Sequence, residues 1–578
     1  MIINNLTEFL ANKNLIQENP DLSTETKLYL GEINCPISVF FSSLGGTIAK
    51  AVAEGGKGTN EDVLTENLTL GWRKKKIGGG WEKAKIVSQR NHEICDVWTT
   101  NILTEADLAG DQKKFVEQEL HQTVLSAGAG LTRKDVIAPI SDFDLTFADD
   151  AQAGRIMSDL QFVPGEAYPF TYNTDFNMKT DESFSRVFFH GIGAPLMATS
   201  DEVTDPEHLK YGPFMVDMTF MSGLKYRSDL YKKYGARVHF DENQMVTAIY
   251  DSDEEKLYLP GEPGWEEAKL QARVSCITLC TMREHLAQTH LIVSNNASYE
   301  SVMNLHPEHP IRRLLALHTF NAVGVNQLAF EVLVPDQCAI HRGTPLEYEG
   351  GFREVFNNAY STSVAYEPFT DREIKNPKLK ELAYPEGDGE TSKFPYLSEG
   401  CEFYEITRTF VREWLEKAGD EAKDEYALAF YEAMKKTSKG QAYELPEYSH
   451  DNMVNLITTV IWTVTCYHEL IGHVPDYTCL PTRAGLRIAK RDKTQVDIQA
   501  FLLGAFVTAA TSPPAPQLMA EFPNYIGAGG APEWERDVWT KYLAQMGLQT
   551  KKVQAREMKS DFEFKYFDPS LFECSVSV

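Results

Sequence analysis

The sequence lacks the features that mark membrane-spanning, secreted and nucleic-acid-binding proteins. It has no run of about eighteen apolar residues, so we predict no integral membrane segment. Residues 1–14 are polar and partly acidic, without the basic start and apolar core of a secretory signal. The 56 Lys and Arg residues are outnumbered by 83 Asp and Glu residues, which gives a formal charge of −27. Because nucleic acids and anionic membranes are bound through basic patches, we also predict no nucleic-acid partner.

Paired cysteines and nucleotide-binding loops are missing as well. The nine cysteines are scattered and odd in number, and no two of them form a CxxC pair. This pattern favours buried reduced thiols in a cytoplasmic protein over a disulfide framework or a zinc ribbon. The glycine runs at 45–46, 55–56 and 78–80 form no GxGxxG or GxxxxGK pattern between a strand and a helix, so they indicate loops.

Apolar and helix-forming sequence is abundant. A hydrophobic share of 43% and an aromatic share of 11% are typical of a globular protein with a large core. The 578 residues would suffice for several ordinary domains or for one large helical enzyme domain. Two long apolar stretches, 265–295 and 452–473, predict buried central helices.

Shorter elements are expected around these two helices. A helix should begin at Thr180, whose side chain can cap it ahead of an acidic first turn. Residues 366–400 are rich in proline, glycine and charge and predict a surface loop, and residues 1–135 predict short helices broken by glycine turns. The remaining expected elements are helices at 311–317, 353–360, 401–418, 422–438 and 532–546 and a β-hairpin with strands at 238–240 and 245–250.

Two pairs of histidines lie in the predicted central helices. His285 and His290 are five residues apart and would point about 140° apart on a regular α-helix, so one metal ion could not bind both. A π-turn brings positions five apart to one side, and such turns collect at functional sites. His468 and His473 repeat the spacing downstream. Imidazoles suit iron, zinc, copper or nickel, and an added carboxylate favours non-heme iron; the alternative is hydrogen-bonded core histidines.

A zinc-protease interpretation of the second pair fails. Glu469 follows His468 directly, but in the HExxH motif the second histidine must lie four residues after the first, and that position is Gly472. We therefore expect Glu469 to be an ordinary helix residue.

Several blocks of the sequence, taken in order, resemble the lipoxygenase family. Residues 180–186, followed by Gly191, Ile192 and Pro195, are similar to the family's TDEEFAR…GVNP segment. The other matching blocks are Trp265 at the family's spacing before His285, residues 285–290 as its HxxxxH metal pair, the HPIxxLLxPH…NxLAR-like stretch at 309–330, the TTIIW…H-like helix at 458–468 and the PSxxENSVxI-like end at 569–578.

The resemblance implies a mainly α fold and a metal centre. The implied architecture is a large helical catalytic domain at 136–578, built around the two central helices with small β-hairpin insertions, and a helical segment at 1–135 packed on it in place of a β-sandwich lipid-binding domain. The implied ligands of a non-heme iron, or of manganese in the same ligand set, are His285, His290, His468 and the carboxylate of Val578. An α-carboxylate is ionised well below neutral pH and can serve as a ligand if the tail is threaded inward.

The sequence departs from the family at several positions. The fourth side-chain ligand of the family falls four residues after the helix histidine, where this sequence has Gly472. His473 is a candidate ligand if the helix contains a π-like bulge or a one-residue insertion, and a water-filled position is the alternative. Phe330 replaces the arginine that ends the NxLAR block, which bears on the substrate more than on the metal, and Cys574 replaces an asparagine of the tail.

The implied activity is dioxygenation of a polyunsaturated fatty acid to a lipid hydroperoxide. In this chemistry a metal hydroxide takes a hydrogen atom from the carbon between two cis double bonds, and O2 adds to the resulting radical. The implied catalytic groups are the ligands His285, His290, His468 and Val578. Two alternatives stay open: the same fold and metal acting on another lipid or on a fatty-acid hydroperoxide as an isomerase or lyase, and a non-catalytic lipid-binding protein. We predict neither the fatty acid, its regiochemistry nor the oligomeric state.

Overall fold

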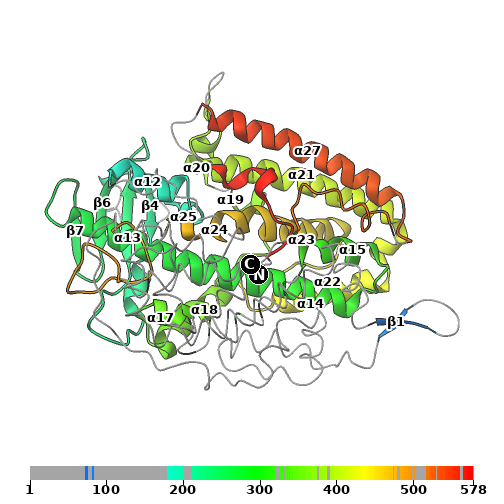
Figure 1. Ribbon diagram of the computed structural model, residues 1–578, viewed down its shortest axis with the longest axis horizontal. Helices are drawn as coiled ribbons and strands as arrows, with labels where there is room; N and C mark the ends of the chain where they lie inside the picture. Colours follow the sequence, from blue (N-terminus) through cyan, green and yellow to red (C-terminus); the bar gives the residue numbers. More distant parts are fainter. Residues whose placement is uncertain are drawn as a thin grey trace, which may run out of the picture.

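The computed structural model describes a largely helical molecule with a small antiparallel sheet at one end (Figure 1). The described residues are 72–75, 81–83 and, with gaps, 179–576; the larger gaps are 201–209, 321–338 apart from a few residues, 387–390, 498–515 apart from residue 500, and 560–563, and residue 473 also lies outside. No helix within these ranges has the length and the apolarity needed to cross a membrane.

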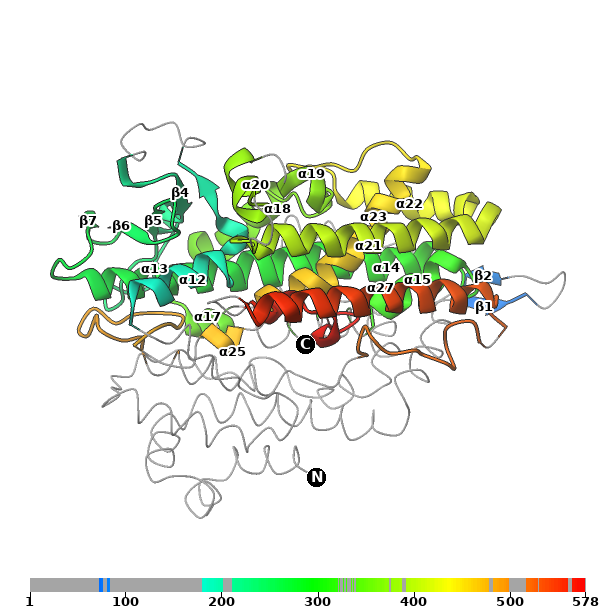
Figure 2. The same cartoon turned by 90° about the horizontal axis from the view of Figure 1, so that it is seen from above.

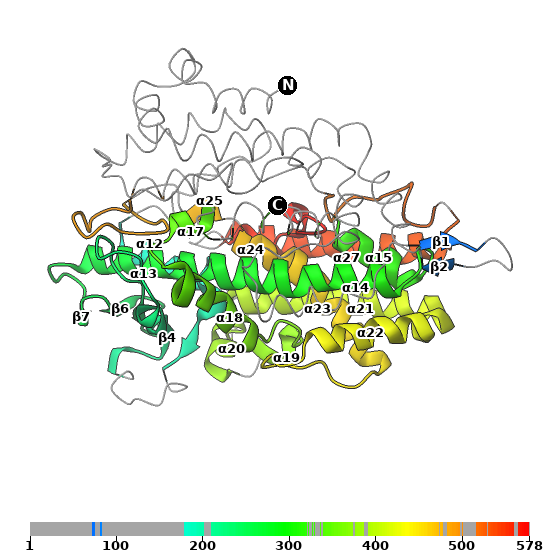
Figure 3. The same cartoon turned by 90° about the horizontal axis from the view of Figure 1, so that it is seen from below.

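A long central helix runs through the molecule (Figure 3). It consists of α13 (Trp265–Leu279), the π-helical segment η6 (Cys280–Ser294) and α14 (Asn295–Asn304), which follow one another without a break. The predicted helix at 265–295 is therefore confirmed and continues for nine more residues, because helical backbone angles persist through Ser294 and Asn295. Nearly all of its side chains are buried, and these include charged ones such as Lys269, Arg273 and Glu284.

The second central helix packs against the first. It begins with α23 (His450–Trp462), continues through the π-helical segment η9 (Thr463–Tyr467) and ends as α24 (His468–Gly472), with α25 (Val474–Tyr477) after it. Ser449 caps it by accepting a hydrogen bond from the backbone N–H of Asn452 at 3.1 Å. The second central helix therefore begins at His450, two residues before the predicted start at 452.

Further helices cover the central pair. The long helices α21 (Pro395–Ala418) and α27 (Trp534–Glu557) lie side by side on one face (Figures 1 and 2). Both are longer than predicted, while the other expected helices are close to their predicted bounds. These are α12 (Asp181–Phe189), α15 (Pro310–His318), α18 (Arg353–Ser361) and α22 (Glu425–Thr437), and α17 (Ala339–Gly343) was not anticipated.

The prediction of a surface loop at 366–400 is wrong. This stretch contains α19 (Phe369–Glu373), α20 (Pro377–Ala383) and the first turns of α21. The side chain of Asn376 accepts from the backbone N–H groups of Lys378 and Leu379, each at 3.1 Å, and Pro377 occupies the first turn of α20. Proline is compatible with the first turn of a helix, where its missing N–H would have no partner. The prolines here begin helices rather than exclude them.

The β-structure is a five-stranded antiparallel sheet in which the strands pair in sequence order. The predicted hairpin is confirmed as β5 (Ala236–Phe240) and β6 (Val246–Asp251), with Val238 opposite Ile249. Its neighbours are β3 (Ala198–Thr199), β4 (Phe214–Asp217) and β7 (Lys256–Tyr258). The outer strands are only two to four residues long, too short to show alternation in the sequence.

The helical prediction for residues 1–135 falls mostly outside the described residues. Where it can be compared it is wrong, because β1 (Trp72–Lys74) and β2 (Trp81–Lys83) form a two-stranded antiparallel ladder with Trp72 opposite Lys83. The five described cysteines, Cys276, Cys280, Cys401, Cys466 and Cys574, are free and buried, as predicted.

Two of the sequence blocks that suggested a family meet in space. The carboxylate of Asp181, at the start of α12, accepts from the indole Nε1 of Trp265 and from Nζ of Lys269, both at 2.7 Å. Thr180 caps the same helix by accepting from the backbone N–H of Ser183 at 3.0 Å, as predicted. These contacts fasten α12 to the beginning of the central helix.

Candidate metal centre

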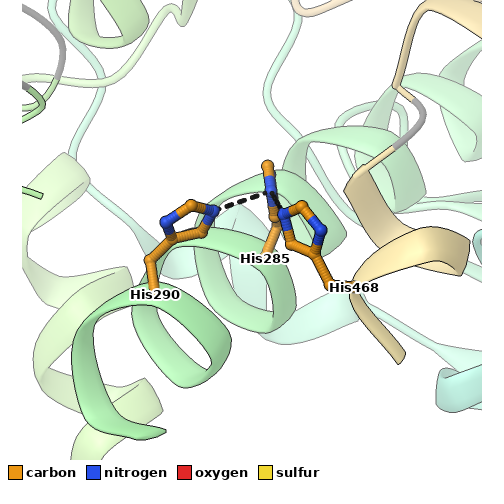
Figure 4. A group of neighbouring side chains, drawn as sticks. All are labelled: His285, His290 and His468. Atoms are coloured by element: carbon orange, nitrogen blue, oxygen red, sulfur yellow. Dashed lines mark hydrogen bonds between the residues drawn. The ribbon is translucent and has the colours of Figure 1, made fainter. Parts of the chain in front are cut away.

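Three of the predicted histidines converge between the two central helices. Figure 4 shows the rings of His285 and His290, from one helix, turned toward the ring of His468 from the other. Nε2 of His285 lies 3.0 Å from Nε2 of His468 and 3.1 Å from Nε2 of His290. The coordinating atoms of the three residues all lie within 4.8 Å of one another, an arrangement that would allow them to share one metal ion.

The distances match those between neighbouring ligands of one metal. Two imidazole nitrogens at about 2.1 Å from an ion and 90° apart are about 3.0 Å from each other. Hydrogen bonds among the rings cannot account for both contacts, because a neutral imidazole nitrogen carries either one proton or one lone pair. Nε2 of His285 faces two nitrogens, so at most one of these contacts can be a hydrogen bond. The donor set therefore fits a bound cation.

The π-turn expected between His285 and His290 is present. Both residues lie in η6, and the backbone N–H of Asn295 reaches back five residues to the carbonyl of His290. The hydroxyl of Thr289 makes a similar contact, donating to the carbonyl of Glu284 at 2.8 Å. Because a π-turn takes about 4.4 residues, positions five apart return to one side of the helix. A second π segment, η9, ends directly before His468.

Asn326 fixes the ring of His290. Nδ1 of His290 lies 3.1 Å from Oδ1 of Asn326, and Nδ2 of Asn326 donates to the carbonyl of His290 at 2.8 Å. The amide oxygen therefore accepts from the Nδ1–H group and leaves the lone pair of Nε2 toward the cluster. Burial lowers the pKa of His290 to about 4, so the ring is neutral at pH 7, the form that binds a metal. The sequence marked Asn326 as part of a motif but gave no role to it.

Gly472 lies where a fourth side-chain ligand would be expected. A Cβ atom at this position would lie 3.3 Å from Nε2 of His468 and 3.4 Å from Nε2 of His285. The position thus faces the cluster, and glycine leaves the adjacent space without a side chain. Glu469, one residue after His468, is buried in α24. His473 lies outside the described residues.

Glu284 and Tyr467 form a second contact between the two helices that the sequence analysis missed. They precede His285 and His468, and the hydroxyl of Tyr467 donates to Oε2 of Glu284 at 2.7 Å. Glu284 also accepts from Arg283 Nε at 2.5 Å and from Gln288 Nε2 at 3.1 Å. The sequence could have indicated this contact, because Glu284 lies in a helix predicted to be buried. A buried carboxylate requires hydrogen-bond donors or a cation nearby.

The C-terminal segment enters the core as far as it is described. Cys574, Ser575 and Val576 are fully buried. Nδ1 of His318 lies 3.0 Å from the carbonyl of Cys574, and the hydroxyl of Ser575 donates to the carbonyl of Phe320 at 2.9 Å. Burial lowers the pKa of His318 to about 4, so the ring is neutral at pH 7 and its Nδ1–H can donate to that carbonyl. Val578 lies outside the described residues.

Comparison with solved structures identifies the fold. A calcium-dependent 11R-lipoxygenase aligns with a TM-score of 0.61 and 16% sequence identity, over 90% of this chain and 80% of that chain. A coral 8R-lipoxygenase aligns with a TM-score of 0.60 and 14% identity, over 90% of this chain and 81% of that chain. The chain has the lipoxygenase catalytic-domain fold. The mainly α prediction, with two central helices and a small antiparallel sheet, is confirmed.

Sequence comparison agrees with the fold at low identity. The mouse epidermal-type polyunsaturated fatty acid (12S)/(13S)-lipoxygenase is 24% identical over 352 residues, which are 56% of this chain and 50% of that protein. Linoleate 9/13-lipoxygenase of Pseudomonas aeruginosa is 25% identical over 219 residues, or 36% of this chain and 30% of that protein. The chain thus spans half or less of the length of these curated relatives. No protein-family model matches the sequence.

Proposed function

We propose that this protein is a lipoxygenase-type dioxygenase that inserts O2 into a polyunsaturated fatty acid to give a lipid hydroperoxide. The observation that carries the proposal is the convergence of three Nε2 atoms between the two buried central helices of a lipoxygenase fold. The matched relatives are named for polyunsaturated fatty acids or linoleate, and one lipoxygenase of the same fold is described in complex with arachidonate. These names support a polyunsaturated fatty acid as the substrate class.

The proposed metal ligands are His285, His290 and His468, with iron as the metal and manganese as the alternative. When bound, such a metal supplies the one-electron chemistry that removes a hydrogen atom between two cis double bonds and allows O2 to add. The protein's own residues prepare the site. Asn326 holds one ring in the required tautomer, and the Tyr467–Glu284 contact holds the segments that carry His285 and His468 together.

Two further ligands belong to the proposal. The buried course of residues 574–576 supports the carboxylate of Val578 as an oxygen ligand. Adding one residue after Val578 would then remove that carboxylate from its place and weaken metal binding, and unchanged occupancy would remove Val578 from the ligand set. The position that faces the cluster is Gly472, so His473 is proposed as a ligand on the condition that a π-like bulge or a one-residue insertion turns it toward the other histidines. If His473→Ala keeps the metal affinity of the unmodified protein, water fills that position.

The experiment that tests the activity combines metal analysis with turnover. Purified protein should contain one equivalent of iron or manganese, and with linoleate it should consume O2 while conjugated-diene absorbance rises. His290→Ala should lose both the metal and the absorbance change. Metal-free protein that still binds fatty acid would refute the proposal and favour a lipid-binding role.

A second candidate has its own supporting observation. Gly472 leaves the space beside His468 and His285 without a side chain, so the metal surroundings differ from those in the resembling family. A changed ligand set is compatible with an isomerase or lyase acting on a fatty-acid hydroperoxide. Metal-loaded protein that takes up no O2 with linoleate but consumes a hydroperoxide would establish this candidate in place of the first.

A further inference from the structure

A buried arginine in the first half of the central helix has no hydrogen-bond acceptor among the residues that the structure describes. Arg273, in α13, is only 4% exposed, and no described residue forms a hydrogen bond or an ion pair with its guanidinium group. Its neighbour is the ring of Phe184, whose centroid lies 5.4 Å from Cζ. An aromatic face attracts a cation but accepts none of its N–H groups in the way a carboxylate does.

Other buried arginines show what is missing at Arg273. Arg313 contacts Glu535 at 2.8 Å, Arg487 contacts Asp497 at 2.8 Å, and Arg556 is paired with Glu399. Burying a cation without a carboxylate partner costs free energy. The unpaired guanidinium of Arg273 is therefore expected to bind an anion from outside the chain.

The guanidinium lines a small pocket whose walls are positively charged. Lys179, Lys269 and Arg483 contribute to the same lining, and Glu266 is its acidic residue. Nζ of Lys269 is already held by Asp181 at 2.7 Å and by Glu266 at 2.8 Å. Burial lowers the pKa of Arg273 to about 9, with a further contribution from the nearby charge of Arg483, while Glu266 acts in the opposite direction. This local excess stands out in a chain with a formal charge of −27.

We propose that this pocket binds a small oxyanion, a carboxylate or a phosphate group, through the guanidinium of Arg273 with Lys179 and Arg483 beside it. The planar guanidinium presents paired N–H groups that match two oxygens of such an anion. The anion is either free in solution or the head group of a lipid. Lys179, Arg273 and Arg483 come from separate parts of the chain, namely the residue before the cap of α12, α13 and the loop at 482–483. An anion there would draw these parts together.

The pocket is distinct from the histidine cluster. Arg273 and His285 are twelve positions apart (285 − 273), which corresponds to about 18 Å along a helix. Anion binding at Arg273 therefore needs no metal, and the proposal does not depend on the proposed dioxygenase activity.

Titration of the full-length protein with acetate and with inorganic phosphate at constant ionic strength tests the proposal. Calorimetry should show one saturable site for one or both anions, and the melting temperature should rise on the order of 2 °C at an anion concentration of about 100 times Kd. In an anion-free buffer, Arg273→Met should melt at or above the temperature of the unmodified protein, because it removes an unpaired buried charge. Its melting temperature should no longer respond to the anion.

Additional variants guard against loss of the fold and against general charge effects. Lys179 is exposed, so Lys179→Met should fold normally while its affinity for the anion falls several-fold. Arg273→Lys keeps the charge and should retain weaker binding. Arg412→Met, which removes a partly exposed arginine of α21 that pairs with Asp451 of α23, should bind the anion like the unmodified protein.

A lipid ligand separates the two sources of the anion. Oleate has no carbon between two double bonds, so its binding can be measured without oxygenation. Tighter binding of oleate than of acetate, lost in Arg273→Met, would identify a lipid head group, and equal affinity would identify a free anion. The proposal is overturned if no anion binds saturably. It is also overturned if binding is unchanged in both Arg273→Met and Lys179→Met, or if Arg412→Met weakens it equally.

Discussion

At the scale of single residues, the candidate centre depends on side chains that orient the histidines. Asn326 accepts from Nδ1 of His290 and donates to the carbonyl of the same residue. We predict that Asn326→Ala lowers metal affinity about 10- to 100-fold, because the ring loses the partner that fixes its tautomer and orientation. Competition with a chelator measures this change. The control is Asn304→Ala, which removes a side-chain donor to Glu300 on α14. Equal affinities in the two variants would contradict the assignment.

Gly472 is the second position where one residue shapes the centre. A larger side chain there would press against Nε2 of His468 and His285, 3.3 and 3.4 Å from the first added carbon. We predict that Gly472→Leu lowers metal occupancy at least about tenfold, because the side chain fills the space beside the ligands and overpacks the site. Gly547→Leu is the matched control on helix α27, where the nearest atom to an added Cβ is 4.0 Å away. Full metal occupancy in Gly472→Leu would show that the space is not needed.

At the scale of elements, two π segments bring three histidines to one point. The contact from Tyr467 to Glu284 joins these segments beside the ligands. We predict that Tyr467→Phe lowers the free energy of unfolding by about 1–2 kcal/mol, since a buried carboxylate loses one of its donors. Combined with Glu284→Gln in a double-mutant cycle, it should show a coupling energy of about 0.5–3 kcal/mol. Additive effects measured by urea unfolding would mean that the two side chains act independently.

The sequence predicted these elements where local rules govern them. The five-residue spacing of His285 and His290 predicted a π-turn if both bind one metal, and the cap at Thr180 located the start of α12. It failed at residues 366–400, where prolines begin helices, and in the first part of the chain, where β1 and β2 pair. Contacts between residues far apart in the sequence could not be predicted either. The bond from Tyr467 to Glu284 joins residues 183 positions apart, and no local pattern specifies such a pair.

At the scale of the whole molecule, neutral buried histidines make stability depend on pH. Burial lowers the pKa of His190 to about 3 and the pKa values of His309, His318 and His341 to about 4. Above about pH 6.5 these histidines are neutral in both the folded and the unfolded protein. Below that value the unfolded chain takes up protons and the folded protein does not, so stability falls as the pH decreases.

We therefore predict that the melting temperature decreases between pH 6.5 and pH 4. Burial raises the pKa of Glu399 to about 7 and also raises the pKa of Glu421, and both groups act in the opposite direction, but the four histidines outnumber them. Differential scanning calorimetry across this range measures the net effect. His318→Gln should reduce the slope, because one buried ring no longer resists protonation. A melting temperature that stays constant or rises on acidification would contradict the neutral state of these histidines.

The central claim is that three imidazoles from two helices hold one metal ion in a lipoxygenase fold. X-ray absorption spectroscopy of the iron-loaded protein tests it most directly. The account predicts one iron per chain, with the scattering signature of three imidazoles at about 2.1 Å, or four if His473 also binds, and loss of one imidazole in His468→Ala. Sulfur ligands, fewer than three imidazoles, or a spectrum unchanged by His468→Ala would contradict it.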